Sequence, residues 1–185
     1  WGADGNDLAE LARPYSIRFP GMAFFVPNGP DRCKMNPAGR EWFDIDDRVN
    51  GPDHAAPVIK TAISALLSAF RLNESALVLA GFSQGGMMVL HCGLRLQAAP
   101  AAIISFSGAL LRHEDLSATP VIPYPPVQLV HGSADQVVPC ARMGEAVQIL
   151  QQLGIVVDSV KRPGLGHGID PDGLTASIAF LASHI

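Results

Sequence analysis

The 185-residue sequence has few of the features that would tie it to a membrane or to nucleic acid. No apolar run approaches the roughly 18 residues of a membrane span, and the first residues lack the basic and apolar regions of a signal peptide. Lysine and arginine form no cluster, and the net charge is −4. We therefore expect no nucleic-acid partner and no stable membrane insertion.

Cysteine is also scarce, with only Cys33, Cys92 and Cys140. An odd number of cysteines without a CxxC pair excludes a disulfide framework of the secreted type. No pair among the histidines, cysteines and acids has the ligand spacing of a zinc site. The pattern predicts a reduced, cytoplasmic protein without a bound metal.

Charged residues make up only 16% of the chain, whereas hydrophobic residues make up 48%. This balance excludes disorder and indicates a compact globular protein. A chain of this length can bury roughly 70% of its unfolded surface. We expect a single domain over residues 1–185.

Short apolar runs alternate with segments of helical spacing, which is typical of an α/β protein with a mainly parallel central sheet flanked by helices. The expected strands are 22–26, 77–80, 101–106, 127–130 and 155–160, and the expected helices are 7–12, 57–70, 141–153 and 171–183. Helix 57–70 is expected to bury a stripe that includes Val58, Ala62 and Leu66. Residues 27–56 form a long loop, of a length that is usually functional or mobile.

The strongest local signal is Gly81-Phe82-Ser83-Gln84-Gly85, which lies between the strand at 77–80 and a segment with helical spacing. A strand–turn–helix context gives a Gly-x-Ser-x-Gly pattern its chemical meaning, because the turn exposes the serine hydroxyl. Gly81 and Gly85 allow the strand and the helix to approach closely. We interpret Ser83 as a nucleophile.

Two further residues would complete the chemistry. Asp135 lies just beyond the strand at 127–130, and His167 lies in a glycine-rich loop between the last strand and the last helix. Parallel α/β sheets carry their working residues at the carboxyl ends of strands, and serine, acid, histidine is the order of an α/β-hydrolase triad. We expect His167 to act as the general base and Asp135 to orient its imidazole.

The other histidines and acids have simpler interpretations. We expect His91 to be packed on the helix after Ser83, and His131 to satisfy nearby backbone groups. Asp170 and Asp172 are typical of the cap and first turn of the last helix. A buried, inert thiol is expected at Cys140, although its position close to Asp135 makes its reactivity worth testing.

An acyl-transfer site also needs an oxyanion hole. The backbone N–H of Gln84, the residue after the nucleophile, is one expected donor. A second donor is expected from an early glycine-rich loop, and residues 1–5 are the early stretch of that kind.

Taken together, the segments around Ser83, residues 131–139 and Gly166-His167 closely resemble the phospholipase/carboxylesterase family of α/β-hydrolases, which includes acyl-protein thioesterases and small bacterial carboxylesterases. Trp42 and Phe43 are similar to that family's aromatic segment. These two side chains either line an acyl pocket or pin their loop to the core.

The resemblance implies an α/β-hydrolase fold, a triad of Ser83, Asp135 and His167, and oxyanion donors at Gln84 and Trp1. It also implies that the strands and the Leu-His-Gly segment that precede the oxyanion loop in the family are missing from this sequence. Family members are cofactor-free and often dimeric, so a homodimer is an expectation of the resemblance.

The function that the resemblance implies is a serine carboxylesterase acting on short- to medium-chain esters. A thioesterase or lysophospholipase with the same mechanism is the first alternative. A ligand-binding protein without catalysis, because its oxyanion hole is incomplete, is an alternative of another class.

Overall fold

The computed structural model of the chain describes residues 2–116 and 123–185. Two compact units are present, residues 1–55 and residues 56–185, and the single domain predicted over 1–185 remains a prediction. Helix α3 (Gly51–Phe70) crosses the boundary between them in sequence. Within the described ranges, no helix combines the length and the hydropathy that a membrane span requires.

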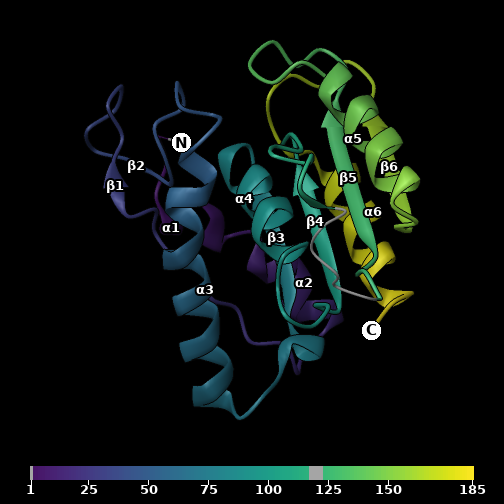
Figure 1. Cartoon of the computed structure of the whole chain (residues 1–185). Coiled ribbons are helices and arrows are strands. Elements are labelled where there is room, and N and C mark those ends of the chain that lie inside the picture. Colours follow the sequence, from purple (N-terminus) through teal and green to yellow (C-terminus); the bar gives the residue numbers. More distant parts are fainter. Residues whose placement is uncertain (1, 117–122) are drawn as a thin grey trace. The chain divides into compact units, whose positions relative to one another are not determined.

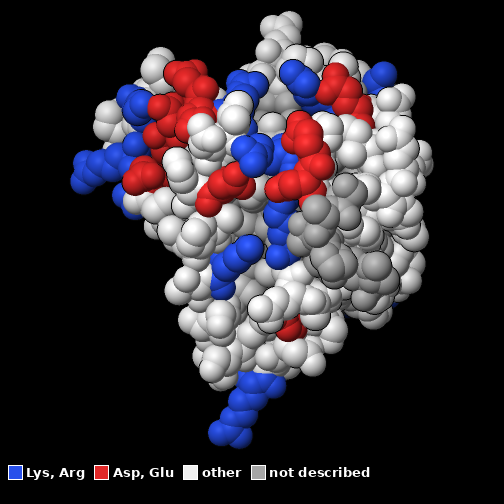
Figure 2. Space-filling view, in the orientation of Figure 1, with Lys and Arg blue, Asp and Glu red and all other residues white. Residues whose placement is uncertain are grey.

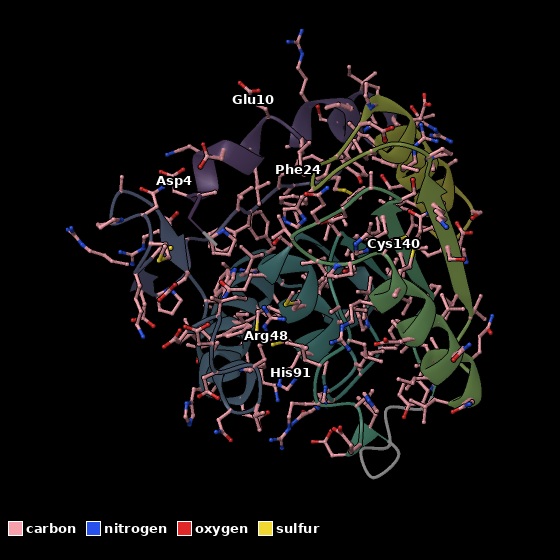
Figure 3. All side chains as sticks on the ribbon, turned by 90° about the horizontal axis from the view of Figure 1, so that it is seen from above. Asp4, Glu10, Phe24, Arg48, His91 and Cys140 are labelled. Atoms are coloured by element: carbon pink, nitrogen blue, oxygen red, sulfur yellow. The ribbon has the colours of Figure 1, made fainter. Side chains whose placement is uncertain are left out.

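The first unit contains two short helices and one short strand pair. Helix α1 (Gly5–Ala9) begins after Asp4, whose carboxylate accepts hydrogen bonds from the backbone N–H groups of Asn6 and Asp7. Figure 3 shows Asp4 and Glu10 at the two ends of this helix. Helix α2 (Ala12–Arg18) follows, and strands β1 (Asp31–Arg32) and β2 (Arg40–Glu41) pair antiparallel within the predicted long loop.

The helix predicted over 7–12 is wrong in its bounds. The structure divides the segment into α1 and α2, and Pro14 is the third residue of α2 rather than a residue beyond a helix end. Proline is tolerated in a first helical turn because its missing N–H has no intrahelical acceptor there.

The strand predicted over 22–26 is also wrong. These residues form no helix or strand, and Phe24 and Phe25 are 39% and 57% exposed. A strand is stabilised by hydrogen bonds to a neighbouring strand, and among the described residues of this unit the strand pairing is that of β1 with β2. The apolar character of residues 22–26 is therefore not sufficient to form a strand.

Helix α3 begins six residues before the predicted start at Pro57. The amide of Gly51 donates to Asp47 at 2.9 Å and that of His54 donates to Asn50 at 3.0 Å, so helical turns form upstream of the proline. The buried stripe also differs from the prediction. Val58 is 46% exposed, whereas Ile63 and Leu67 are buried against Leu96.

The second unit is a four-stranded parallel sheet with helices on both faces (Figure 1). The strand order is β3 (Val78–Phe82), β4 (Ala102–Phe106), β5 (Val127–Gly132) and β6 (Val157–Arg162). Helix α4 (Gln84–Gly93) lies between β3 and β4 in sequence, α5 (Ala141–Gln152) lies between β5 and β6, and α6 (Pro171–Ala182) follows β6. Glu74–Ala76 is a short 3₁₀ turn before β3. The predicted α/β class with a parallel central sheet flanked by helices is confirmed.

Burial on both faces explains the nearly continuous apolar character of the central strands. Val127 and Leu129 of β5 belong to a core that also contains side chains of α4 and α5. The intervening Gln128 lies on the other face, where its side-chain Nε2 is 3.3 Å from the carbonyl of Ala176 in α6. Successive strand residues point to opposite faces, so both sets of side chains are covered by helices.

The strand register brings the functional candidates of this unit to one edge of the sheet. Phe82 is paired with Phe106, Phe106 with Val130, and Gly132 with Arg162. The residues that follow these strands therefore emerge side by side at the carboxyl ends. Ser83, the loop at 133–140 and the loop at 163–170 all start there.

Candidate active site

Ser83 occupies a strained turn between β3 and α4. Its backbone has φ 53° and ψ −118°, a conformation that non-glycine residues rarely adopt. The amide of Ser83 donates to the carbonyl of Phe106 at 2.8 Å, and its own carbonyl accepts from Met87 at 3.0 Å. The sheet and the helix together hold the strained residue in place, as is common at functional sites.

Close approach of the backbone makes this turn possible. A Cβ at Gly81 would lie 2.3 Å from the carbonyl oxygen of Gly85, and a Cβ at Gly86 would lie 2.7 Å from Oγ of Ser105. No side chain fits at these separations. The prediction that Gly81 allows β3 and α4 to approach is confirmed.

Asp135 lies in the loop after β5, and its side chain is fully buried. Its Oδ1 accepts two backbone hydrogen bonds, from Val137 and Val138, each 2.9 Å long. Burial alone would raise the pKa of this carboxyl, but the hydrogen bonds from His167, Val138 and Val137 outweigh it and hold the pKa below its ordinary value. Asp135 is therefore an ionised acceptor at neutral pH.

His167 lies in the loop between β6 and α6 and joins the other two residues. Its Nδ1 is 2.8 Å from Oδ2 of Asp135, and its Nε2 is 2.9 Å from Oγ of Ser83. An ionised carboxylate accepts only, so Nδ1 carries the ring proton and Nε2 is left to accept the hydroxyl proton of Ser83. The ring of Phe82 packs against the imidazole at a centroid distance of 4.8 Å.

The histidine loop is attached to the loop that carries the acid. Gly164 donates its N–H to Oγ of Ser133 at 2.8 Å, and Ala134 donates to the carbonyl of Leu165 at 2.9 Å. A Cβ at Gly132 would lie 2.3 Å from the carbonyl oxygens of Leu165 and Gly166. The small residue at position 132 thus allows the two loops to touch.

His131 has a second partner that its sequence position did not indicate. Its Nε2 is 2.8 Å from the carbonyl of Val138, which confirms the predicted backbone contact. The same Nε2 is 3.2 Å from Oδ2 of Asp135, and both side chains are buried. Because a carbonyl only accepts, Nε2 of His131 carries a proton and faces the carboxylate as a donor.

Gln84 is the first residue of α4 and its side chain is fully buried. Its backbone N–H is at the positive end of the helix, next to Ser83. Trp1, the other predicted oxyanion donor, lies outside the described residues. Its role stays a prediction.

The predicted pocket residues belong to the first unit. Trp42 is half-buried, and Phe43 is 4% exposed. A Cβ at Gly51 would lie 2.7–2.9 Å from atoms of the Phe43 side chain, so Phe43 packs on the start of α3. This contact supports the alternative in which Phe43 pins its loop, and the pocket role of both residues stays a prediction.

The three cysteines are free thiols, and two of them are buried. Burial raises the pKa of the Cys92 thiol to about 12. The prediction that Cys140 is buried is wrong, because this residue is half-buried at the start of α5. His91 is buried in α4, as predicted (Figure 3). Among residues 2–116 and 123–185, no three His, Cys, Asp or Glu side chains form a group that could hold a metal ion.

Charges of both signs lie next to one another on the face drawn in Figure 2, and uncharged residues cover much of the rest. Ion pairs among the described residues include Lys34 with Asp44 and Arg142 with Glu145. A mixed surface of this kind does not attract polyanions in the way that a continuous basic surface does.

A profile of the family described as Phospholipase/Carboxylesterase matches residues 1–185. Esterase YpfH of Escherichia coli (strain K12) is 28% identical over 193 residues, which cover 100% of this chain and 78% of that protein. Acyl-protein thioesterase 1 of Gibberella zeae is 34% identical over 113 residues, which cover 59% of this chain and 48% of that protein. The match therefore spans about half the length of the thioesterase.

Solved structures are also similar to this chain. The crystal structure of esterase PE8 superposes with a TM-score of 0.95 at 38% identity, covering 100% of this chain and 89% of that chain. The structure of SOBER1 from Arabidopsis thaliana superposes with a TM-score of 0.86 at 20% identity, covering 99% and 94%. The second likeness shows the fold alone.

Proposed function

Because the chain belongs to the phospholipase/carboxylesterase family of α/β-hydrolases, we propose that it is a serine carboxylesterase acting on short- to medium-chain carboxylic esters. The observation that carries the proposal is the continuous hydrogen-bonded line from Asp135 through His167 to Ser83. The link from Ser83 to His167 has the length that proton transfer to a base requires.

In the acylation half-reaction, Oγ of Ser83 attacks the ester carbonyl carbon while Nε2 of His167 takes the hydroxyl proton. The imidazolium then gives that proton to the leaving alkoxide, which departs as an alcohol and leaves an acyl group on Ser83. Asp135, which stays ionised, stabilises the imidazolium through its contact with Nδ1. In the deacylation half-reaction, water attacks the acyl carbonyl carbon while Nε2 of His167 takes its proton. The imidazolium then returns the proton to Oγ of Ser83, and the carboxylic acid is released.

Each tetrahedral intermediate places a negative charge on the former carbonyl oxygen. We assign the Gln84 backbone N–H as one donor to this oxygen and the Trp1 N–H as the second. Loss of one such donor typically slows the reaction by about 10²–10³. If the oxyanion hole lacked one of these donors, the protein would bind esters without hydrolysing them. A ligand-binding function of this kind is the alternative to an enzyme.

A thioester or lysophospholipid substrate is the closest alternative, because Gibberella zeae acyl-protein thioesterase 1 is among the relatives. Simple esters are favoured by YpfH and PE8, both named esterases, which align with all of this chain. A serine nucleophile attacks both carbonyl types by the same steps, so substrate comparison must separate them.

We also propose a reducing, cytoplasmic location and a homodimer, as expected for such a family member. All three cysteines are free thiols, two of them buried, which suits a reducing compartment. Sedimentation of the purified chain measures the oligomeric state.

Hydrolysis of p-nitrophenyl esters from acetate to palmitate, with an acyl-thioester series alongside, tests the proposal. Turnover that is greatest on short esters and lost in Ser83→Ala supports a carboxylesterase. The control is Ser159→Ala, which removes an exposed hydroxyl from β6 and leaves Ser83 intact. Equal labelling of wild type and Ser83→Ala by a serine-directed phosphonate would reject Ser83 as the nucleophile.

A further inference from the structure

An ion pair joins the two ends of the loop that carries His167. Arg162 is the last residue of β6, and Asp170 is the residue that caps α6. Nε of Arg162 is 3.1 Å from Oδ1 and 2.9 Å from Oδ2 of Asp170, and Nη2 is 2.9 Å from Oδ2. The guanidinium therefore contacts both oxygens of the carboxylate, across seven intervening residues.

This pair differs from an ordinary surface ion pair, which contributes little because solvent screens it and both side chains are mobile. The side chains of Arg162 and Asp170 are only 20% and 24% exposed. Oδ1 of Asp170 also accepts the N–H of Gly173 at 2.8 Å, so the carboxylate is fixed to the helix. The hydrogen bond from Arg162 lowers the pKa of Asp170 by more than burial raises it, so the carboxylate stays charged at neutral pH.

The first half of the loop has other attachments, because the backbone of Arg162 and Leu165 accepts hydrogen bonds from Ser133 and Ala134. Residues 166–169, the second half of the loop, have fewer attachments. Within the described residues, no backbone–backbone hydrogen bond involves 166–169, and a Cβ at Gly166 or Gly168 would meet no atom within 4 Å. Two glycines around His167 leave its backbone with unusual freedom.

We propose that Arg162 and Asp170 are positioning residues that hold His167 in line with Ser83 and Asp135. The inference rests on the proposed function, and it specifies which residues keep the general base in place. The acid loop fixes the near end of the histidine loop, and the Arg162–Asp170 pair fixes the far end. Without the pair, His167 spends less time at hydrogen-bond distance from Ser83.

Two variants remove the pair from opposite sides. Asp170→Asn keeps a side chain that caps helices as well as aspartate does, but it removes the charge that Arg162 binds. Arg162→Gln leaves the Asp170 cap intact. The matched control is Asp172→Asn, which removes the other, 76% exposed carboxylate that contacts Arg162.

We expect both Asp170→Asn and Arg162→Gln to lower kcat by about tenfold or more with KM nearly unchanged, because displacement of a catalytic group by a fraction of an ångström slows the chemical step. Asp172→Asn stays within about twofold of wild type. Arg162→Lys keeps the charge but not the two-pronged geometry, so it recovers only part of the loss. Thermal unfolding of each variant confirms that it is folded.

The NMR signal of the Nδ1 proton of His167, which is hydrogen-bonded to Asp135, gives a readout that needs no substrate. Weakening or loss of this signal in Arg162→Gln, in a folded variant, supports the proposal even if the wild type hydrolyses no ester, in which case the proposed function alone fails. A signal in Arg162→Gln as strong as in the wild type would overturn the proposal, as would an unchanged kcat. Equal losses in Asp170→Asn and Asp172→Asn would also overturn it, since a general charge effect would then suffice.

Discussion

His167 and Asp135 are joined by a hydrogen bond of 2.8 Å between Nδ1 and Oδ2, although they are 32 positions apart in the sequence. Oδ1 of the same carboxylate accepts the amides of Val137 and Val138. His131 faces Oδ2 from 3.2 Å. A carboxylate surrounded by donors on both oxygens has one stable orientation, and it imposes that orientation on the imidazole.

Asp135→Asn should abolish most of the activity without removing the side chain. An amide can donate to Nδ1, which would shift the ring proton of His167 to Nε2 and leave no base facing Ser83. We expect kcat for p-nitrophenyl acetate to fall by about 10⁴-fold. A loss below tenfold would show that the Asp135–His167 contact does not set the tautomer.

The carboxylate of Asp135 should make the free energy of unfolding depend on pH in the acid range. The pKa of Asp135 is lower in the folded chain than the value of about 3.9 expected when unfolded, so ionised Asp135 stabilises the fold above about pH 4. That contribution is lost as the pH falls through the folded-state pKa.

Urea unfolding of wild type and Asp135→Asn between pH 7 and pH 2 measures this dependence. The variant should lose less stability on acidification than the wild type does. Asp172→Asn, at an exposed carboxylate, serves as the control and should follow the wild type. Identical pH slopes for wild type and Asp135→Asn would contradict the prediction.

Gly132→Ala should separate the acid loop from the histidine loop. The added Cβ would lie 2.3 Å from two carbonyl oxygens, so the histidine loop must move. We expect a loss of about 1–3 kcal/mol in the free energy of unfolding, typical of overpacking, together with a fall in kcat.

Gly144→Ala is the matched control for this change. Gly144 lies within α5, and a Cβ there would meet no atom within 4 Å. Alanine should stabilise the helix by about 0.5–1 kcal/mol and leave kcat unchanged. A stable, fully active Gly132→Ala protein would refute the contact between the two loops.

His131→Leu should destabilise the acid loop. The carbonyl of Val138 would lose its donor at a buried position, which typically costs about 1–3 kcal/mol. His131→Gln retains an N–H donor and should recover part of the stability. Chemical denaturation of the two variants measures the difference, and equal stability of His131→Leu and wild type would reject the role.

Local chemistry in the sequence determined much of the candidate site. The Gly-x-Ser-x-Gly turn around Ser83 is encoded by neighbouring residues, because glycine is required where β3 and α4 meet. Asp135 and His167 were predicted because each follows an apolar run of strand length, and the carboxyl ends of parallel strands share one edge. The spacing of apolar residues likewise predicted β4, β5, α5 and α6 nearly to their ends.

Only the tertiary structure decided the features that depend on distant partners. The apolar run at 22–26 is not a strand, since strand formation needs a neighbour that periodicity cannot supply. Asp170 was predicted as a helix cap, yet its bond to Arg162 depends on the length and path of the loop between them. The contact of His131 with Asp135 depends in the same way on how the acid loop turns back. Sequence patterns report local propensity and burial, whereas these contacts arise from the three-dimensional path of the chain.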